Sequence, residues 1–325
     1  MSESRTLIID GDLVAYRHAA AAEERSIIVK SLKTGKELEF KNRTELKSFV
    51  KEKGFKYNPE HYEITDVQKP ADVAIAFATV KNLIEKLQEA AWADDIEIYI
   101  GSGKTFRHDL PLPLPYKSNR EDNIKPVHLQ AVRNYMRKKY NTKIVDNGME
   151  VDDVVTIRSY EYLRAGKEAV LASVDKDSYQ CQEIVVLNWM SDNWQLETIP
   201  VVGSLRKAKN VIKGDGLKFL ALQVLAGDTA DTYCGYDLSK IKYGPARAMK
   251  ALENAQTEAQ VMQVLFNEFK RLYPAPFSYT DCHGKEHEAN WQSMLKLYWQ
   301  CAYMKRSWND PSDVYDFMDE RGIIL

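Results

Sequence analysis

Eight carboxylates in four short stretches have the residue types and spacing of a metal-binding site. They are Asp10 in "RTLIID", Glu150, Asp152 and Asp153 in "GMEVDDVV", Asp175 and Asp177 in "SVDKDS", and Asp228 and Asp231 in "LAGDTAD". Acids that share a small volume raise one another's pKa, and divalent cations remove this repulsion. Carboxylate oxygens suit hard ions such as Mg²⁺ or Mn²⁺. Eight acids are enough for two ions, an arrangement that stabilises the attacking and leaving oxygens in phosphoryl displacement.

Each acidic cluster taken alone also fits a purely structural interpretation. Asp and Glu in the first turn of a helix complement the helix dipole, and Asp is common in turns. The joint placement of the clusters favours function, because in a doubly wound sheet ligands bind where the carboxyl ends of the strands meet.

The elements that must position these acids alternate between strands and helices. The predicted strands are residues 5–10, 96–102, 142–148, 168–174 and 183–189, and the predicted helices are residues 70–92, 126–140 and 150–166. This alternation predicts an α/β fold with a mainly parallel central sheet flanked by helices. From about residue 203 the pattern becomes mostly helical, which predicts a second, helical part.

Two further segments have local signals. Residues 25–40 predict a β-hairpin that turns at Thr34 and Gly35. The three prolines of "DLPLPLPYK", residues 109–117, cannot continue a helix and predict an extended, exposed connector.

Basic residues concentrate in residues 104–143, which contain ten Lys or Arg and three Asp or Glu, although the net charge of the chain is −2. Beside an acidic, metal-loaded pocket, such a segment suits a polyanion that is cut at one phosphate. A solvated surface helix is the simpler interpretation of "RNYMRKKY". The candidate DNA contacts are Lys104, Arg107, Lys125, Arg133 and Arg137 in this segment, and Lys242 and Arg247 in the helical part.

The composition is that of an ordinary globular protein. The chain has 325 residues, of which 44% are hydrophobic and 28% charged, and its length predicts two domains. We find no apolar run long enough to span a membrane. The four cysteines show no CxxC spacing, which indicates a reduced, cytoplasmic setting.

Five motifs occur in the order "LIIDGD", "YKSNRED", "GMEVDDVV", "SVDKDS" and "LAGDTADTYCGY…GPARAMKAL". Together they resemble the 5′→3′ exonuclease and flap endonuclease family, most closely the stand-alone phage exonucleases, over most of residues 5–253. The resemblance implies a PIN-like α/β nuclease domain in residues 1–202, with a basic arch or clamp at about residues 104–143. It implies a helical part in residues 203–325, with a helix–three-turn–helix DNA-binding module at about residues 214–253.

The resemblance also implies an activity. Members of the family hydrolyse phosphodiesters near 5′ ends by a two-metal mechanism that leaves 5′-phosphates. We therefore expect two Mg²⁺ ions, with Mn²⁺ as a substitute. The expected substrates are duplex DNA with a 5′ end or flap, and RNA in RNA/DNA hybrids. The expected setting is DNA replication or breakdown of host DNA in the cytoplasm of a phage-infected bacterial cell. The sequence does not tell which protein partners, if any, the chain has.

Carried over residue by residue, the resemblance assigns individual roles. Asp10, Glu150, Asp152 and Asp153 resemble ligands of the first metal, and Asp175, Asp177, Asp228 and Asp231 resemble ligands of the second. Lys117 and Arg120 match the basic pair that contacts the scissile phosphate, so we expect them to be catalytic. Tyr116 lies where an aromatic residue packs against a terminal base. Gly244 resembles the turn whose backbone amides meet phosphates, in some members with a bound K⁺.

The sequence departs from the family at two positions. The family has an aspartate after the second strand, where Gly101 or Ser102 stands in this chain, so one contact to the first metal is missing or replaced by water. The turn before Gly244 reads "GYDLSKIKYG" and lacks the glycine-rich spacing of the K⁺ sites. Two other functions stay open. One is a PIN-type ribonuclease for single-stranded RNA, and the other is a structure-specific DNA-binding protein with a weakened catalytic centre.

Overall fold

The computed structural model describes residues 4–54, 58–120, 123–191 and 193–325. The chain divides into two compact units. The first consists of Met1–Gly11, Glu85–Asn123 and Tyr140–Leu325, and the second of Asp12–Ile84 and Ile124–Lys139. In the described part of the chain, no helix is long and apolar enough to cross a membrane.

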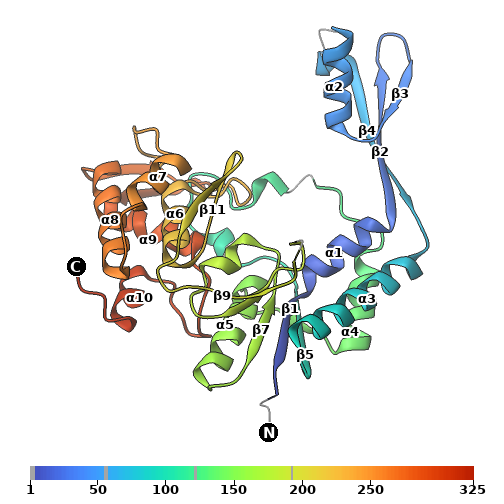
Figure 1. Cartoon of the computed structure of the whole chain (residues 1–325). Coiled ribbons are helices and arrows are strands. Elements are labelled where there is room, and N and C mark those ends of the chain that lie inside the picture. The colour runs from blue at the N-terminus through green and yellow to red at the C-terminus, as the bar shows by residue number, and fades with distance from the viewer. Residues whose placement is uncertain (1–3, 55–57, 121–122, 192) are drawn as a thin grey trace. The chain divides into compact units, whose positions relative to one another are not determined.

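The helices and strands of the described residues are numbered in chain order, and Figure 1 labels those for which there is room. The α-helices are α1 (Gly11–Ala21), α2 (Arg43–Lys53), α3 (Val73–Ala91), α4 (Leu129–Tyr140), α5 (Val151–Arg164), α6 (Gly216–Ala226), α7 (Pro245–Leu252), α8 (Glu258–Leu272), α9 (Trp291–Ala302) and α10 (Val314–Glu320). The strands are β1 (Thr6–Asp10), β2 (Glu23–Ser31), β3 (Glu37–Phe40), β4 (Tyr62–Pro70), β5 (Asp95–Gly101), β6 (Lys143–Val145), β7 (Ala169–Ala172), β8 (Val185–Leu187), β9 (Leu196–Thr198), β10 (Leu205–Ala208), β11 (Val211–Gly214), β12 (Phe277–Thr280) and β13 (Glu286–Ala289).

The central sheet of the first unit has the strand order β6-β5-β1-β7-β8-β9. Its strands run parallel except for β9, which pairs antiparallel with β8. All five residues of β1 are buried, as expected for a central strand covered on both faces. The predicted α/β fold with a mainly parallel sheet is confirmed.

Helix α5 packs on this sheet through an apolar stripe that begins among the acids. Val151, Val154 and Val155 are buried and share a core with Ile8 of β1 and Leu171 of β7. The valines around the acidic stretch are therefore core residues that fix the start of the helix.

Close packing also fixes the end of β1. A Cβ atom on Gly11 would lie 2.7 Å from the backbone oxygen of Tyr99 in β5, too close for any side chain. Asp10 pairs in register with Tyr99. A glycine after Asp10 thus lets the two strands keep their spacing at the edge of the sheet where the acids lie.

The C-terminal helices share one hydrophobic core, which includes Leu220 of α6, Leu265 of α8 and Trp299 of α9. The expectation of a mostly helical part after residue 203 is confirmed, with two short hairpins, β10–β11 and β12–β13, inserted in it. Helices α6 and α7 lie within residues 214–253 and are joined by an irregular segment. The domain boundary after residue 202 and the DNA-binding role of residues 214–253 stay predictions.

The prolines at residues 109–117 do not form the exposed connector that we expected. Leu112 is buried in the core of the C-terminal helices, and its carbonyl accepts a 2.8 Å hydrogen bond from the backbone N–H of Cys282. The carbonyl of Pro111 accepts one from the hydroxyl of Tyr279. The prolines prevent a helix, but Leu112 still buries its side chain against the C-terminal helices, whereas Leu114 is exposed.

The second unit contains a three-stranded antiparallel sheet in the order β3-β2-β4. Ile27, Val29 and Phe40 of this sheet pack against Leu46 of α2. The predicted hairpin is confirmed, and Gly35 has the positive φ of 69° that its turn requires. Strand β4 was not predicted, and Pro70 ends this strand instead of beginning the following helix.

Candidate metal centre

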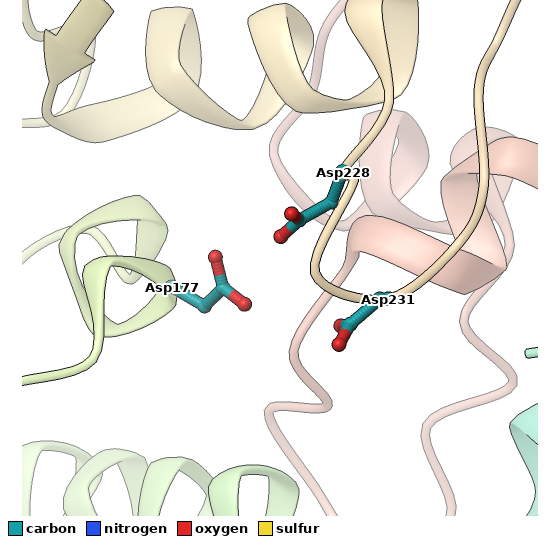
Figure 2. Close-up of side chains that lie close together, drawn as sticks. All are labelled: Asp177, Asp228 and Asp231. Atoms are coloured by element: carbon teal, nitrogen blue, oxygen red, sulfur yellow. The ribbon is translucent and has the colours of Figure 1, made fainter. Parts of the chain in front are cut away.

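Three carboxylates from two distant segments of the first unit face one another (Figure 2). Asp177, Asp228 and Asp231 each contribute one oxygen, and these oxygens lie within 4.8 Å of one another. Asp177 lies in the short 3-10 helix Lys176–Gln180 that follows β7, and the other two lie in the turn after α6. All three side chains are buried. This arrangement can hold a metal ion.

The turn after α6 is shaped by its backbone. Gly227 ends the helix with a φ of 77°, and a Cβ atom there would lie 2.2 Å from the backbone oxygen of Tyr233. Asp228 and Tyr233 exchange two backbone hydrogen bonds, of 2.9 and 3.2 Å. The carboxylate of Asp228 also accepts a 2.8 Å bond from the N–H of Ala230. A closed turn that only glycine can begin therefore fixes the positions of Asp228 and Asp231.

Burial and like charges oppose ionisation of this cluster. Burial, and then the charge of Asp175, raise the pKa of Asp177 to about 6. Burial also raises the pKa of Asp231. The amine of Lys176 lies 2.9 Å from an oxygen of Asp177 and also contacts Asp228. A half-exposed lysine thus supplies counter-charge between two carboxylates that could bind a cation.

A second group of acids adjoins the first. The pKa of Asp152 is raised well above its usual range by burial and by the charges of Asp175, Asp10 and Glu150, in that order. Asp175 begins the segment that carries Asp177. The carboxylate of Asp175 accepts a 2.9 Å hydrogen bond from the backbone N–H of Asp177. The acids at the ends of β1 and β7 and at the start of α5 therefore do meet at one edge of the sheet.

Glu150 and Asp153 have a different partner, the fully buried Arg107. The guanidinium binds both oxygens of Asp153, at 2.6 and 2.9 Å, and reaches Glu150 at 3.2 Å. Burial alone would raise the pKa of Glu150, but the charges of Arg107 and Lys117 outweigh it and lower that pKa.

Asp153 accepts two further hydrogen bonds, at 3.2 Å from the N–H of Glu150 and at 3.1 Å from the N–H of Lys305. Each of its oxygens then has two donors, which is the number of lone pairs on a carboxylate oxygen. In this arrangement Asp153 holds Arg107 and has no lone pair left for a metal. The sequence-based assignment of Asp153 as a ligand does not fit these contacts.

The predicted catalytic cations lie at the cluster. The amine of Lys117 is 2.6 Å from Glu150 and 3.8 Å from Asp231, and Arg120 is 2.7 Å from Asp231. The N–H of Lys117 donates to the carbonyl of Asp231 at 2.9 Å, which holds Lys117 at a φ of 58°, rare for a residue with a side chain. Asn119 donates to the carbonyl of Thr229 at 2.9 Å. Hydrogen bonds therefore hold the residues after the prolines, Lys117 and Asn119, against the turn that carries Asp228 and Asp231.

Two of the predicted DNA contacts are buried. Arg107 is 0% exposed, so the prediction that it contacts DNA is wrong. Its guanidinium binds the carboxylate of Asp153 inside the protein. Tyr116 is 4% exposed and donates its hydroxyl to Asp231 at 2.9 Å, so its ring is not placed to pack against a base.

The remaining predicted DNA contacts keep surface positions. Lys104 is exposed and forms a 2.5 Å ion pair with Asp109. Lys242 and Arg247 are exposed on either side of Gly244, which precedes the first residue of α7. In the second unit, Lys125 and Arg137 are exposed, and Arg133 lies 3.5 Å from Asp12.

Ser102 does not replace the aspartate that the family has after the second strand. Its hydroxyl donates to the backbone oxygen of Val145 at 2.7 Å, which ties the end of β5 to β6. Sequence analysis also missed Lys176 and Gln223, both of which contact Asp177. Lys176 could have been found, because it lies between two predicted ligands, whereas no pattern marks Gln223.

Comparisons with known proteins found similar solved structures. No protein-family model matches the chain, and no curated protein matches it. The chain is similar to a zinc-bound structure of the T5 5′-exonuclease, with a TM-score of 0.46 and 15% identity over 82% of this chain and 86% of that chain. It is also similar to a bacteriophage T5 flap endonuclease in complex with DNA and metal ions, with a TM-score of 0.47 and 12% identity over 82% of this chain and 88% of that chain.

Proposed function

We propose that the chain is a divalent-metal-dependent nuclease that hydrolyses DNA phosphodiesters near 5′ ends, as a 5′→3′ exonuclease and 5′-flap endonuclease. The observation that carries the proposal is the set of three carboxylates within 4.8 Å, with Lys117 and Arg120 beside them. Acids that bind divalent ions next to cations that can bind a phosphate suit hydrolysis of a phosphodiester. The T5 flap endonuclease structure contains DNA and metal ions, and we propose the same class of substrate here.

The donor set fits hard ions. All donors of the cluster are carboxylate oxygens, as Mg²⁺ and Mn²⁺ prefer. Burial and neighbouring carboxylates raise the pKa values of Asp152 and Asp177, and a bound cation would favour the ionised form of both. Asp177, Asp228 and Asp231, with Asp175, would hold one ion, and Asp10, Asp152 and Glu150 would hold the other. When bound, two such ions activate the attacking water and stabilise the leaving oxygen.

Lys117 and Arg120 would balance the charge that develops on the phosphate. Each now forms ion pairs with acids of the cluster, namely Glu150 and Asp231. With cations on those carboxylates, the attraction of Glu150 and Asp231 for the two basic side chains would be weaker. Lys117 and Arg120 would then be available to a phosphate oxygen, where they would stabilise the charge that develops in the transition state.

Exposed basic residues would bind the DNA away from the cut. Lys242 and Arg247 flank the N-terminus of α7 at Gly244, and backbone amides at a helix start bind phosphates. K⁺ at this turn, cleavage of RNA in hybrids, and a role in replication or host DNA breakdown in a phage-infected cell are parts of the same proposal. Contacts of this kind recognise backbone and shape rather than base sequence.

A cleavage assay with matched substrates tests the proposal. A 5′-labelled DNA flap and a single-stranded RNA of the same sequence are incubated with the protein, with Mg²⁺ or with a chelator. We expect Mg²⁺-dependent release of short 5′ products from the DNA. Asp228→Asn should abolish release while DNA binding persists. Asp319→Asn, which changes an exposed acid on α10, should cleave like the wild type.

The same assay distinguishes the alternatives. Cleavage of the RNA alone would identify a ribonuclease. Tight binding of the flap without cleavage at any Mg²⁺ concentration would identify a DNA-binding protein with an inactive centre. Either outcome overturns the proposal.

A further inference from the structure

Arg107 uses every hydrogen-bond donor that it has. A guanidinium has five N–H groups, and here two bind Asp153, one binds Glu150, and two bind the backbone oxygens of Cys301 and Tyr303, at 3.2 and 2.7 Å. The side chain is completely buried. A buried charge that loses its partners is strongly destabilising, so this cation cannot leave its place when a metal or substrate arrives.

The cation is anchored by the C-terminal end of α9 and the residues that follow it, Cys301–Lys305. The carbonyls at the end of a helix carry partial negative charge, which favours a cation. The same segment donates the N–H of Lys305 to Asp153 at 3.1 Å. Gln180 holds it from the other side, because its amide donates to the carbonyl of Ala302 at 2.7 Å and accepts from the N–H of Met304 at 3.2 Å.

Residues Cys301–Lys305 contribute no metal ligand, yet they are connected to both groups of proposed ligands, the one that contains Glu150 and the one that contains Asp177. Through Arg107 they contact Glu150, and through Gln180 they contact the short helix that carries Asp177. Glu150 has one oxygen toward Arg107 and the other toward Lys117, at 2.6 Å. The orientation of the Glu150 carboxylate is thus set by two cations, Arg107, which cannot move, and Lys117, which can.

We propose that Arg107, held by Cys301–Lys305, is a positioning residue that orients Glu150 toward the first metal. This inference rests on the proposed function, since it assumes that Glu150 is a ligand. Partners that hold a ligand from outside the metal commonly change metal affinity or activity by about 10- to 100-fold when they are altered. The C-terminal end of α9 is then part of the metal centre, although it follows the last acid of the cluster by 70 residues in sequence.

The test compares two buried arginines of the same region. Arg107→Lys keeps a positive charge but cannot span Glu150, Asp153 and the two carbonyls. Arg306→Lys makes the same change in a residue that is also buried, but whose guanidinium contacts Gln182 and aromatic rings instead of the acids. Mn²⁺ binding is measured by calorimetry, with thermal unfolding in a chelator to confirm that both variants are folded.

We expect Arg107→Lys to weaken Mn²⁺ binding about 10-fold or more, and Arg306→Lys to bind Mn²⁺ like the wild type at a similar loss of melting temperature. Wild-type affinity in Arg107→Lys, or an equal weakening in Arg306→Lys, overturns the proposal. If Arg107→Lys does not fold, Asp153→Asn takes its place, because it loosens the same guanidinium while conserving side-chain shape.

A double-mutant cycle identifies the group through which Arg107 acts. In the background of Glu150→Gln, Arg107→Lys should cause little further loss of Mn²⁺ affinity, because residues that act together are not additive. Fully additive losses would show that Arg107 does not act through Glu150. Failure of the proposed function would be seen differently, as a wild-type protein that neither binds Mn²⁺ nor cleaves DNA.

Discussion

Asp152 and Asp153 are neighbours in the sequence but belong to two regions of the site with opposite electrostatics. Asp152 faces Asp10 and Asp175, and these charges with burial raise its pKa. Asp153 faces away from them and binds Arg107 through both oxygens. Successive side chains at the start of α5 point in different directions, one toward the strand ends and the other toward the C-terminal segment.

The number of acids in a cluster is therefore not the number of metal ligands. One region has excess negative charge, which a metal can neutralise. The other is already neutralised by a buried cation and stabilises the fold without any metal.

Asp153→Asn should destabilise the metal-free protein far more than Asp152→Asn. Removing one partner of a buried ion pair costs about 3–5 kcal/mol, whereas removing the charge of Asp152 relieves repulsion. We therefore expect the free energy of unfolding in a chelator, measured by denaturant titration, to fall by several kcal/mol in the first variant and to stay level or rise in the second. Equal losses in both variants would contradict the division.

Lys117→Ala should lower kcat about 100- to 1,000-fold, as expected when a donor to the developing charge is removed. The folded state should persist, because the lysine side chain is not part of a core. Lys167→Ala, which removes an exposed lysine before β7, serves as the control. Single-turnover cleavage of the DNA flap with saturating Mg²⁺ measures the effect. A fall in DNA affinity with unchanged kcat would place Lys117 outside the reaction.

Asp177→Asn should remove a pH dependence from the stability of the metal-free protein. The pKa of Asp177 is about 6 in the folded protein, above its usual value, so between about pH 4 and pH 6 the folded state binds more protons than the unfolded state. Its contribution to stability is present at low pH and is lost as the pH rises through 6. Melting temperatures in a chelator should therefore fall more steeply with pH in the wild type than in the variant. Parallel curves for the two proteins would show that Asp177 ionises normally.

Lys176→Met should raise the affinity for Mn²⁺ about 5-fold, the effect of removing a half-exposed ion pair worth about 1 kcal/mol. Lys176 now contacts Asp177 and Asp228, so an ion that binds there must displace its amine. The displaced side chain has room in an adjoining cleft of about 680 Å³. Lys207→Met, in the same cleft but without contact to the acids, is the control for calorimetry. Weaker binding in Lys176→Met would mean that the lysine supports the site instead of competing for it.

The sequence determined the architecture and the positions of the acids. Short continuous apolar runs between helical segments predicted the strands, because parallel strands are buried on both faces of the sheet. Asp10 is the last residue of β1 and Asp175 follows β7 closely, so the topology of a parallel sheet was enough to bring them to one edge. The turn at Asp228 was predictable for the same local reason, a glycine that ends a helix.

The tertiary structure alone decided how the charges are paired. Arg107 appeared to be one of ten basic residues in a surface segment, yet its partners come from α5 and from the end of α9. No local pattern reports such a contact, because the free energy of a buried ion pair depends on which distant groups share its low-dielectric surroundings. Sequence therefore determined which carboxylates gather, and the packing of the C-terminal segment decided which of them remain available to a metal.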